Sequence, residues 1–437
     1  MNKTVKVIGA GLAGVEASLY LANKGIKVKL YDIKPNAYTP AHTSKNFAEL
    51  VCSNSLKSND VYGNCAGLLK EELRILGSKI IEIADKTRVP AGNALAVNRE
   101  EFSSLLTKLV LENKNIEFIS KEIEDIDFSE YTIVATGPLT TDKLSKKIEE
   151  IVDGKLAFFD ASAPIVTLES IDMENAFYGD RYDKGDKDHV NCPLTKEEYK
   201  EFISSLLSAE RADKHAFEKD MVFEGCMPIE VMAERGENTL RFGPLKSAGL
   251  TNPKTDRWPY ACLQLRREDK DGTMFNLVGF QTNLKFSEQK RVFSIIPALK
   301  NAEYLRYGVM HKNTFINSPK VLNDDYSLKK SQKTFFAGQI TGVEGYVESA
   351  MSGLLAGIFL ERKINEKDKI ILPETSVMGA ITKYITTENK DFQPMNANFG
   401  IMKPLEQIIR DKAEKKKQMA LRSIKDVKNF KEIIEND

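Results

Sequence analysis

The chain opens on a pattern of apolar and polar positions that predicts a strand, a turn, a helix and a second strand. Residues 4–8 (Thr-Val-Lys-Val-Ile) alternate as in a short buried strand, and residues 15–23 have the spacing of a helix that ends at Gly25. Residues 26–32 form the second strand pattern. A glycine-rich turn at 9–14 joins the first strand to the helix. This order, within roughly 30 residues, is typical of a dinucleotide-binding unit.

The residues of that turn fit such a unit for separate physical reasons. Gly9 permits the tight turn, Gly11 lets the backbone approach a pyrophosphate, and Gly14 lets the helix pack on the strand. Asp32, at the end of the second strand, can accept hydrogen bonds from ribose hydroxyls. The dinucleotide contacts predicted here are Gly9, Ala10, Gly11, Leu12, Ala13, Gly14, Asp32 and Lys34.

Two later segments resemble parts of the flavin site in two-dinucleotide-type flavoproteins. A strand at 132–135 is closed by Thr136-Gly137-Pro138, and a strand at 334–337 leads into a second glycine-rich helix start. That helix extends to about residue 360, and its N-terminus favours a reduced, negatively charged flavin. No second GxGxxG motif exists, so a separate nicotinamide domain is not expected. The flavin-side contacts predicted here are Thr136, Gly137, Gly338, Gln339, Gly342, Gly345 and Tyr346.

The remaining pattern predicts the domain organisation. Residues 66–85 have the spacing of one amphipathic helix, and longer charged stretches begin near residue 166. We therefore expect an α/β fold, with an FAD-binding Rossmann-type (two-dinucleotide-like) domain and an inserted α/β or α+β domain. The expected limits are 1–165 for the first part of the FAD domain, 166–320 for the inserted substrate or RNA-side domain, and 321–437 for the second part. A Lys-rich C-terminal helix from about residue 404 is expected to be a solvated face.

Composition narrows the class of protein. The 437 residues carry 63 Lys and Arg against 63 Asp and Glu, so bulk charge alone does not hold a nucleic acid. No apolar run reaches the roughly 18 residues that a membrane span needs. The five cysteines include no CxxC pair, and the four histidines include no HxxxH or HExxH spacing. We expect a reduced, cytoplasmic protein without disulfides, a metal site or membrane attachment.

One segment is more basic than the chain as a whole. Residues 285–333 hold 10 Lys and Arg against 4 Asp and Glu. Aromatic residues are interleaved with these charges, a mixture that suits phosphate contacts and base stacking. A solvated face over core aromatics is the other interpretation. The aromatic residues are Phe286, Phe293, Tyr304, Tyr307 and Phe315.

Motifs along nearly the whole chain resemble the folate- and FAD-dependent tRNA (uracil-5-)-methyltransferase family. They are VIGAGLAG (7–14), FAELVCSNSLKSN (47–59), GLLKEEL (67–73), VPAGNALAVNREEF (89–102), ATGPLT (135–140), FEGCMP (223–228), NLVGFQTNLKFSEQKRVF (276–293), RYGVMHKNTFINSP (306–319), FFAGQITGVEGYVESAMSG (335–353) and FQPMNANFG (392–400).

The resemblance implies a reaction and its cofactors. A one-carbon unit from 5,10-methylenetetrahydrofolate reaches C5 of a uridine in folded RNA, with FAD as cofactor and NAD(P)H as reductant. C5 of uracil becomes nucleophilic when a thiolate adds to C6, and a base must later remove the C5 proton. The resemblance assigns Cys226 as the nucleophile and Cys52 as the flavin-side base, with the opposite assignment left open. It also implies that Tyr346 stacks on the flavin, while Cys65, Cys192 and Cys262 are expected to be structural.

The sequence is less specific about the residues that contact RNA or folate. The candidate RNA or folate contacts are His42, Asn283, Lys285, Arg291, Arg306, His311 and Lys312. The chain departs from the family pattern in having one histidine at His42 instead of a pair, Asn283 instead of histidine, Phe286 instead of tryptophan, and Ser247-Ala248 in place of Pro-Val. The T-loop uridine of tRNA is the favoured target, a 23S rRNA uridine is the alternative, and no obligatory protein partner is expected.

Three other functions compete with this interpretation. An MnmG-like modifier of the tRNA wobble uridine shares the flavin core, but such enzymes are much longer. A non-catalytic, flavin-containing RNA-binding protein would not need both Cys52 and Cys226. An ordinary flavin oxidoreductase acting on a small molecule does not explain the basic, aromatic segment at 285–333.

Overall fold

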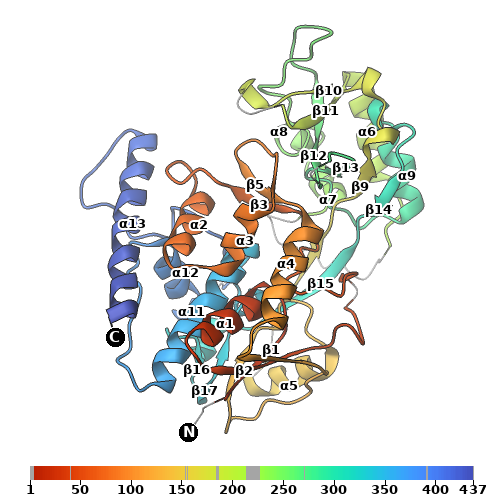
Figure 1. The fold of residues 1–437 in the computed structure, drawn as a ribbon. Coiled ribbons are helices and arrows are strands. Elements are labelled where there is room, and N and C mark those ends of the chain that lie inside the picture. Colours follow the sequence, from red (N-terminus) through yellow and green to blue (C-terminus); the bar gives the residue numbers. More distant parts are fainter. Residues whose placement is uncertain are drawn as a thin grey trace.

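The structure, a computed structural model, has a body built on a parallel sheet, an inserted part to one side of it, and a long C-terminal helix along the body (Figure 1). The structure describes residues 4–39, 41–152, 154, 156–183, 187–212, 227–269, 271–389 and 392–436, without the side chains of 156–161 and 311–313.

The central sheet of the body places the predicted dinucleotide unit at its middle. Strand β1 pairs in parallel with β2 on one side and β7 on the other, so that Val5 lies opposite Val28 and Tyr131. Val5 and Val7 are fully buried because helices cover both faces of the sheet. In spatial order the strands are β16 (Ser327–Leu328), β17 (Ser331–Phe336), β7 (Tyr131–Val134), β1 (Thr4–Ile8), β2 (Lys27–Asp32) and β6 (Ile116–Ser120).

Two helices pack closely on this sheet and bring their N-termini together. They are α1 (Leu12–Asn23) and α11 (Tyr346–Ile364). A Cβ atom on Gly353 would lie 2.2 Å from the carbonyl oxygen of Ala13, so only glycine permits this approach. The other helices of the body are α2 (Cys65–Ile75), α3 (Lys79–Lys86), α4 (Arg99–Leu111), α5 (Asp142–Val152), α10 (Ser318–Val321), α12 (Val377–Thr386) and α13 (Lys412–Asn436), and a small antiparallel sheet has β3 (Ser55–Ser58), β5 (Ala94–Val97) and β4 (Arg88–Val89).

The single helix predicted at 66–85 is wrong, because the chain forms two helices there. Gly77 lies between α2 and α3 with a φ of +77°, a left-handed conformation that interrupts a helix. The Ser78 side chain then accepts a hydrogen bond from the N–H of Ile81 and caps α3. Apolar periodicity continues across the break, so the pattern alone did not reveal it.

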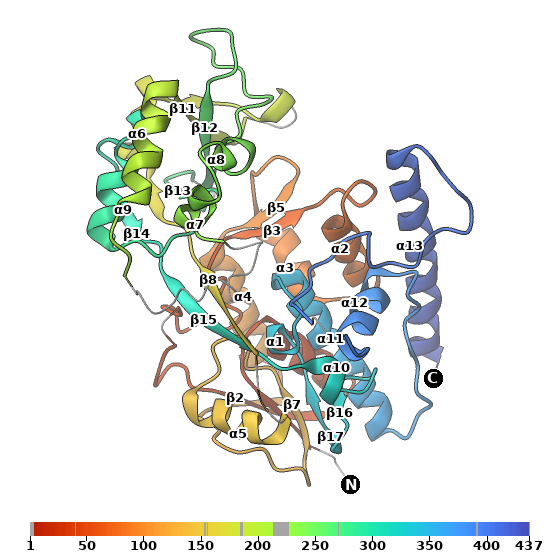
Figure 2. The same ribbon diagram turned by 180° about the vertical axis from the view of Figure 1, so that it is seen from behind.

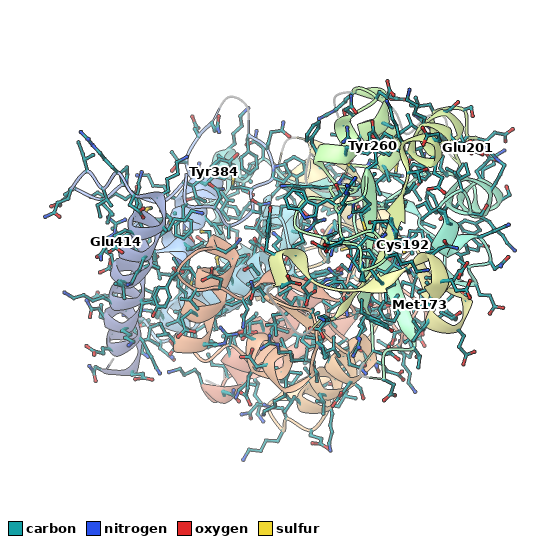
Figure 3. The ribbon with its side chains drawn as sticks, turned by 90° about the horizontal axis from the view of Figure 1, so that it is seen from above. Met173, Cys192, Glu201, Tyr260, Tyr384 and Glu414 are labelled. Atoms are coloured by element: carbon teal, nitrogen blue, oxygen red, sulfur yellow. The ribbon has the colours of Figure 1, made fainter. Side chains whose placement is uncertain are left out.

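The C-terminal helix α13 is not wholly a solvated face, which corrects the prediction. Met419, Val427 and Phe430 are buried along one stripe that faces the body. The Ser423 hydroxyl donates to the buried carboxylate of Glu72 in α2. The Lys-rich surface lies on the other side of the helix. Figure 3 shows α13, with Glu414 labelled, at the far end of the molecule from the inserted part.

The inserted part has its own antiparallel sheet and core, so it is α+β in the strict sense. Its core includes Val166, Phe202, Phe280 and Phe293. In spatial order its strands are β10 (Phe177–Tyr178), β11 (His189–Leu194), β12 (Ala261–Arg267), β13 (Met274–Leu277), β9 (Ile165–Thr167) and β14 (Tyr304–Arg306), with helices α6 (Lys196–Leu207), α7 (Ile229–Glu234), α8 (Thr239–Phe242) and α9 (Phe286–Phe293).

A pair of antiparallel strands runs between the inserted part and the body. They are β8 (Leu156–Ala161) and β15 (Met310–Phe315), visible in Figure 2. The chain therefore leaves and re-enters the body along one ribbon. The domain limits predicted at residues 165 and 320 lie close to these two strands in the sequence, and they stay a prediction.

In the described part of the chain, no helix combines the length and the apolar character that crossing a bilayer requires. Over the same residues, no group of three or more His, Cys, Asp or Glu side chains is placed to hold a metal ion.

Candidate functional site

An elongated cavity opens at the carboxyl ends of β1, β2 and β7, where ligands bind in open α/β sheets. Its empty space, including the part open to solvent, is about 1130 Å³. Most predicted cofactor contacts line it: Gly9, Ala10, Gly11, Leu12, Ala13, Asp32, Lys34, Thr136, Gly137, Gly338, Gln339 and Tyr346.

The first glycine turn provides a cradle for a pyrophosphate. A Cβ atom added to Gly11 would meet no protein atom within 4 Å, so the space before this residue is open. Gly9 has a φ of +104°, and its Cβ would lie 2.5 Å from the carbonyl oxygen of Ala135. Gly11 also caps α1 without any side-chain hydrogen bond, so the first N–H groups of the helix are available to phosphate oxygens.

The Asp32 carboxylate is fixed at the end of β2 by two backbone groups. Its Oδ2 accepts a hydrogen bond from the Ala10 N–H at 2.7 Å, and its Oδ1 accepts one from the Lys34 N–H at 2.9 Å. Each oxygen keeps a further lone pair for ribose hydroxyls. The cradle and this carboxylate together fit the adenosine and pyrophosphate parts of FAD.

The cavity wall beside Asp32 includes three ionisable side chains, those of Lys34, His42 and Glu49. Lys34 Nζ donates to the Asn46 carbonyl at 2.5 Å and lies 3.7 Å from Glu49 Oε2. Burial lowers the pKa of Lys34 and also that of His42, and the nearby Lys34 charge lowers the His42 pKa further. These effects favour the neutral imidazole, and His42 Nδ1 lies 2.5 Å from the Thr39 hydroxyl oxygen, which holds the ring at the cavity wall.

The second glycine turn faces the same cavity from α11. Gly338, Gly342 and Gly345 all have positive φ, which non-glycine residues rarely adopt. Gly345 caps α11 without a side-chain hydrogen bond, so the positive end of this helix dipole lies beside the cavity. Gly14, Gly342 and Gly345 do not line the cavity themselves and act through the backbone geometry of the two turns.

Cys52 and Tyr346 are joined directly, although 294 residues separate them in the chain. Cys52 Sγ lies 2.9 Å from the Tyr346 hydroxyl oxygen, which also accepts the Cys52 N–H at 2.8 Å. Burial raises the pKa of the Tyr346 hydroxyl well above its usual value, and interaction with the Cys52 thiol raises it further. Tyr346 therefore stays protonated, and it lines the cavity while its hydroxyl contacts the Cys52 thiol.

Three arginines lie near this thiol: Arg306 was predicted as an RNA or folate contact, whereas Arg99 and Arg266 were missed as site residues. Arg99 Nε lies 2.6 Å from Glu268 Oε2, and Arg266 donates to the Ser53 hydroxyl at 2.6 Å, next to Cys52. The pKa of Arg306 is lowered by burial and by the charge of Arg99, with a smaller opposing effect from Cys52 and Tyr346. Arg99 belongs to the NREEF motif at 98–102, and that motif is the signal from which it could have been predicted.

Lys70 supports the segment that carries Cys52. Its fully buried ammonium group donates to the carbonyl oxygens of Leu56 at 2.7 Å, Ser58 at 2.6 Å and Ala66 at 3.0 Å. Burial lowers the pKa of Lys70 to about 7. Strand β3 is thus attached to α2 by one side chain.

Replacing Lys70 by methionine is expected to destabilise the fold by about 2–4 kcal/mol, because buried carbonyl oxygens lose their donor. The measurement is urea unfolding followed by circular dichroism. Lys79→Met is the matched control, since Lys79 makes only an exposed pair with Glu82 and should cost about 0–1 kcal/mol. Equal stability of both variants would contradict this role of Lys70.

The other predicted contacts are dispersed. Arg291 pairs with Glu288 at 2.7 Å and Lys285 with Glu210 at 2.5 Å, both on the surface of the inserted part, while Asn283 is buried beside Glu230. His311 and Lys312 lie in β15, but their side chains fall outside the description. Cys226 lies outside the described residues.

Other cavity residues were missed by sequence reasoning. They lie in the segment after β6, in the loop that carries His42, and in the first turn of α11: Thr39, Glu49, Lys121, Glu122, Ile123 and Ser349. Recognising residues 116–120 as a strand would have placed 121–123 at the carboxyl edge of the sheet.

Comparison with known proteins agrees with this geometry. The family model described as glucose inhibited division protein A (GIDA) matches residues 4–368. A protein of Acetivibrio thermocellus named methylenetetrahydrofolate–tRNA-(uracil-5-)-methyltransferase TrmFO is 54% identical over 428 residues, covering 98% of each chain. A protein of Fusobacterium nucleatum with the same name is 55% identical over 430 residues, covering 98% of this chain and 99% of its own.

Among solved structures, GidA of Aquifex aeolicus superposes with a TM-score of 0.72 at 16% identity, covering 99% of this chain and 74% of that one. This likeness shows the fold of an FAD-binding GidA-type protein, as predicted. The identities above 50% over almost the whole length show more than the fold. This chain belongs to the GIDA family and, within it, to the TrmFO proteins.

Proposed function

We propose that this chain methylates C5 of a uridine in structured RNA, with 5,10-methylenetetrahydrofolate as one-carbon donor, NAD(P)H as reductant and FAD as cofactor. The names of relatives at 52–55% identity support the reaction. The observation that carries the proposal to this chain is the Cys52 thiol, held 2.9 Å from the hydroxyl of Tyr346, a residue that lines the dinucleotide cavity. A simple flavin oxidoreductase has no need of a thiol there.

The proposed roles of the two cysteines follow from the reactivity of uracil. A thiolate, assigned to Cys226, adds to C6 and moves electron density onto C5, which then bonds to the one-carbon unit while the bond from that carbon to the folate nitrogen breaks. A base, assigned to Cys52, takes the C5 proton, and the electrons of that bond expel the Cys226 thiolate from C6. FAD bound in the cavity and reduced by NAD(P)H would supply the hydride that completes the methyl group.

The residues around Cys52 suit the task of a base. Its Sγ is fixed by the Tyr346 hydroxyl, so the thiol cannot rotate freely. Arg266 is tied to the neighbouring Ser53, and Arg99 is paired with Glu268. Cationic groups near a thiol favour its thiolate form, which is the form that accepts a proton.

The RNA target is proposed to be the T-loop uridine of tRNA, because the relatives are named for a tRNA activity. The enzyme would act in the cytoplasm and need no obligatory protein partner. Mass mapping of 5-methyluridine in tRNA and in rRNA, from cells with and without this gene, tests the target. Loss of the tRNA modification alone is the expected result, whereas loss from 23S rRNA alone would replace the target and leave the chemistry in place.

The MnmG-like alternative is not favoured. The similarity to GidA of Aquifex aeolicus is limited to 16% identity and leaves about a quarter of that longer chain unmatched. The relatives above 50% identity match over their full length instead.

A further inference from the structure

Three aromatic side chains of the inserted part form one parallel stack, in which Phe286 is exposed and the two tyrosines are half-buried. The rings of Phe286 and Tyr307 lie 4.7 Å apart at 14°, and those of Tyr307 and Tyr304 lie 5.0 Å apart at 9°. Aromatic pairs in proteins are commonly offset-stacked or edge-to-face, and Phe280 with Phe293 is an edge-to-face pair at 63°. The stack of Phe286, Tyr307 and Tyr304, called the ring column below, consists of three nearly parallel rings.

The ring column is held from within by one buried amide. Gln289 Nε2 donates to the carbonyl oxygens of Leu284 and Gly308, both at 2.8 Å. Its Oε1 accepts the N–H of Gly308 at 2.8 Å. Because Leu284 precedes Phe286 and Gly308 follows Tyr307, this clamp fixes the two ring-bearing segments against each other. The column is therefore preorganised, and a ligand would not have to order it.

The two ends of the column have different surroundings. Arg306, which faces the charges of Arg99 and Cys52, lies between the two tyrosines in the chain. The β14–β9 pairing is irregular between Tyr304 and Arg306, which redirects the side chains there. At the other end, Phe286 begins α9 and leaves 53% of its surface exposed.

The charge beside Phe286 identifies the class of ligand. Lys290 on α9 is exposed and makes no ion pair with any residue that the structure describes, so it is available for a phosphate. Lys285 and Arg291 flank the ring as well, although each already pairs with a glutamate. A flat apolar ring bordered by cations is the arrangement that binds unpaired nucleotides.

We propose that the exposed face of Phe286 is a stacking platform for an unpaired nucleobase of the RNA, distinct from the uridine that reacts. The inference rests on the proposed function. The ring column extends the base stack into the protein, and Lys290 contacts a phosphate next to the stacked nucleotide. Single-stranded or loop RNA is favoured over a continuous duplex, whose bases are already stacked on each other.

The test measures the RNA affinity of FAD-loaded Phe286→Ala with an unmodified tRNA transcript and with a fully paired RNA duplex. Loss of one stacked base should weaken binding of the transcript by about 5- to 150-fold, the range for roughly 1–3 kcal/mol per base. Duplex binding, FAD content and the KM for folate should not change. Phe286→Trp should restore binding, and Phe286→Leu, which keeps an apolar side chain without a π face, should not.

Leu305→Ala is the matched control, because Leu305 is 55% exposed in the neighbouring strand β14 but belongs to no ring stack. It should bind the transcript like the wild type. Unchanged affinity of Phe286→Ala would overturn the platform, as would a raised folate KM with unchanged RNA affinity or a change in self-association. If the wild type bound neither RNA and did not methylate the transcript, the proposed function itself would fail.

Discussion

Replacing Gly11 by valine is expected to yield a folded but colourless protein. The Gly11 backbone has a φ of −75°, which valine can adopt, and a Cβ there would meet no protein atom within 4 Å. The branched side chain would instead fill the space before α1 that the pyrophosphate needs. We expect the FAD content after purification to fall about tenfold or more, with the free energy of unfolding of the apoprotein unchanged.

Gly14→Ala provides the contrasting control. A Cβ on Gly14 would lie 1.8 Å from the carbonyl oxygen of Gly9, so this variant should lose stability by about 1–3 kcal/mol or more through overpacking, with or without FAD. The absorbance of bound flavin and urea unfolding of the apoproteins separate the two effects. Gly11→Val that purifies with full flavin would show that the pyrophosphate does not lie at this turn.

RNA that carries 5-fluorouridine at the target is expected to separate the roles of the two thiols. Fluorine at C5 cannot leave as a cation, so elimination stalls after methyl transfer and the nucleophile stays bonded to C6. Wild-type enzyme with methylenetetrahydrofolate and NADPH should accumulate a protein–RNA adduct that survives denaturation. Cys226→Ala should form no adduct, because a methyl side chain cannot add to C6.

Cys52→Ala should still permit the addition to C6 but should not methylate normal RNA. Both variants should retain FAD, since neither thiol lies in the first glycine turn. Peptide mapping of the denatured adduct identifies the cysteine. A crosslink at Cys52 would reverse the two roles, and a wild type that forms no adduct with either tRNA or rRNA would exclude covalent addition.

The dinucleotide unit was predictable because its signals are local. The strands at 4–8 and 26–32, the turn at 9–14 and Asp32 are defined within one short segment, and the structure places them around one cavity. The second glycine turn was found for the same reason. Gly77 was not recognised as a helix break, because the apolar spacing on its two sides is nearly continuous.

The part of the site beyond the cofactor cavity could not be predicted from the spacing of residues along the sequence. Cys52 and Tyr346, 294 residues apart in the chain, meet only in the folded protein, and Arg99, Arg266 and Arg306 converge from the body and the inserted part. Likewise, the interleaved aromatics at 286–315 indicated stacking without saying which rings would stack. Phe293 proved to be core, while Phe286 and Tyr307 form the ring column. Tertiary packing decides these contacts, and no local pattern contains them.

The central claim, methylation of RNA from folate, is tested most directly by following the transferred carbon. The purified protein is given unmodified tRNA transcript, NADPH and methylenetetrahydrofolate that carries deuterium on its methylene carbon, and the nucleosides are analysed by mass spectrometry. The account predicts 5-methyluridine whose methyl group retains both deuterium atoms, formed without S-adenosylmethionine. Formation of 5-methyluridine without deuterium, or no 5-methyluridine in tRNA or rRNA with the FAD-loaded enzyme, would contradict it.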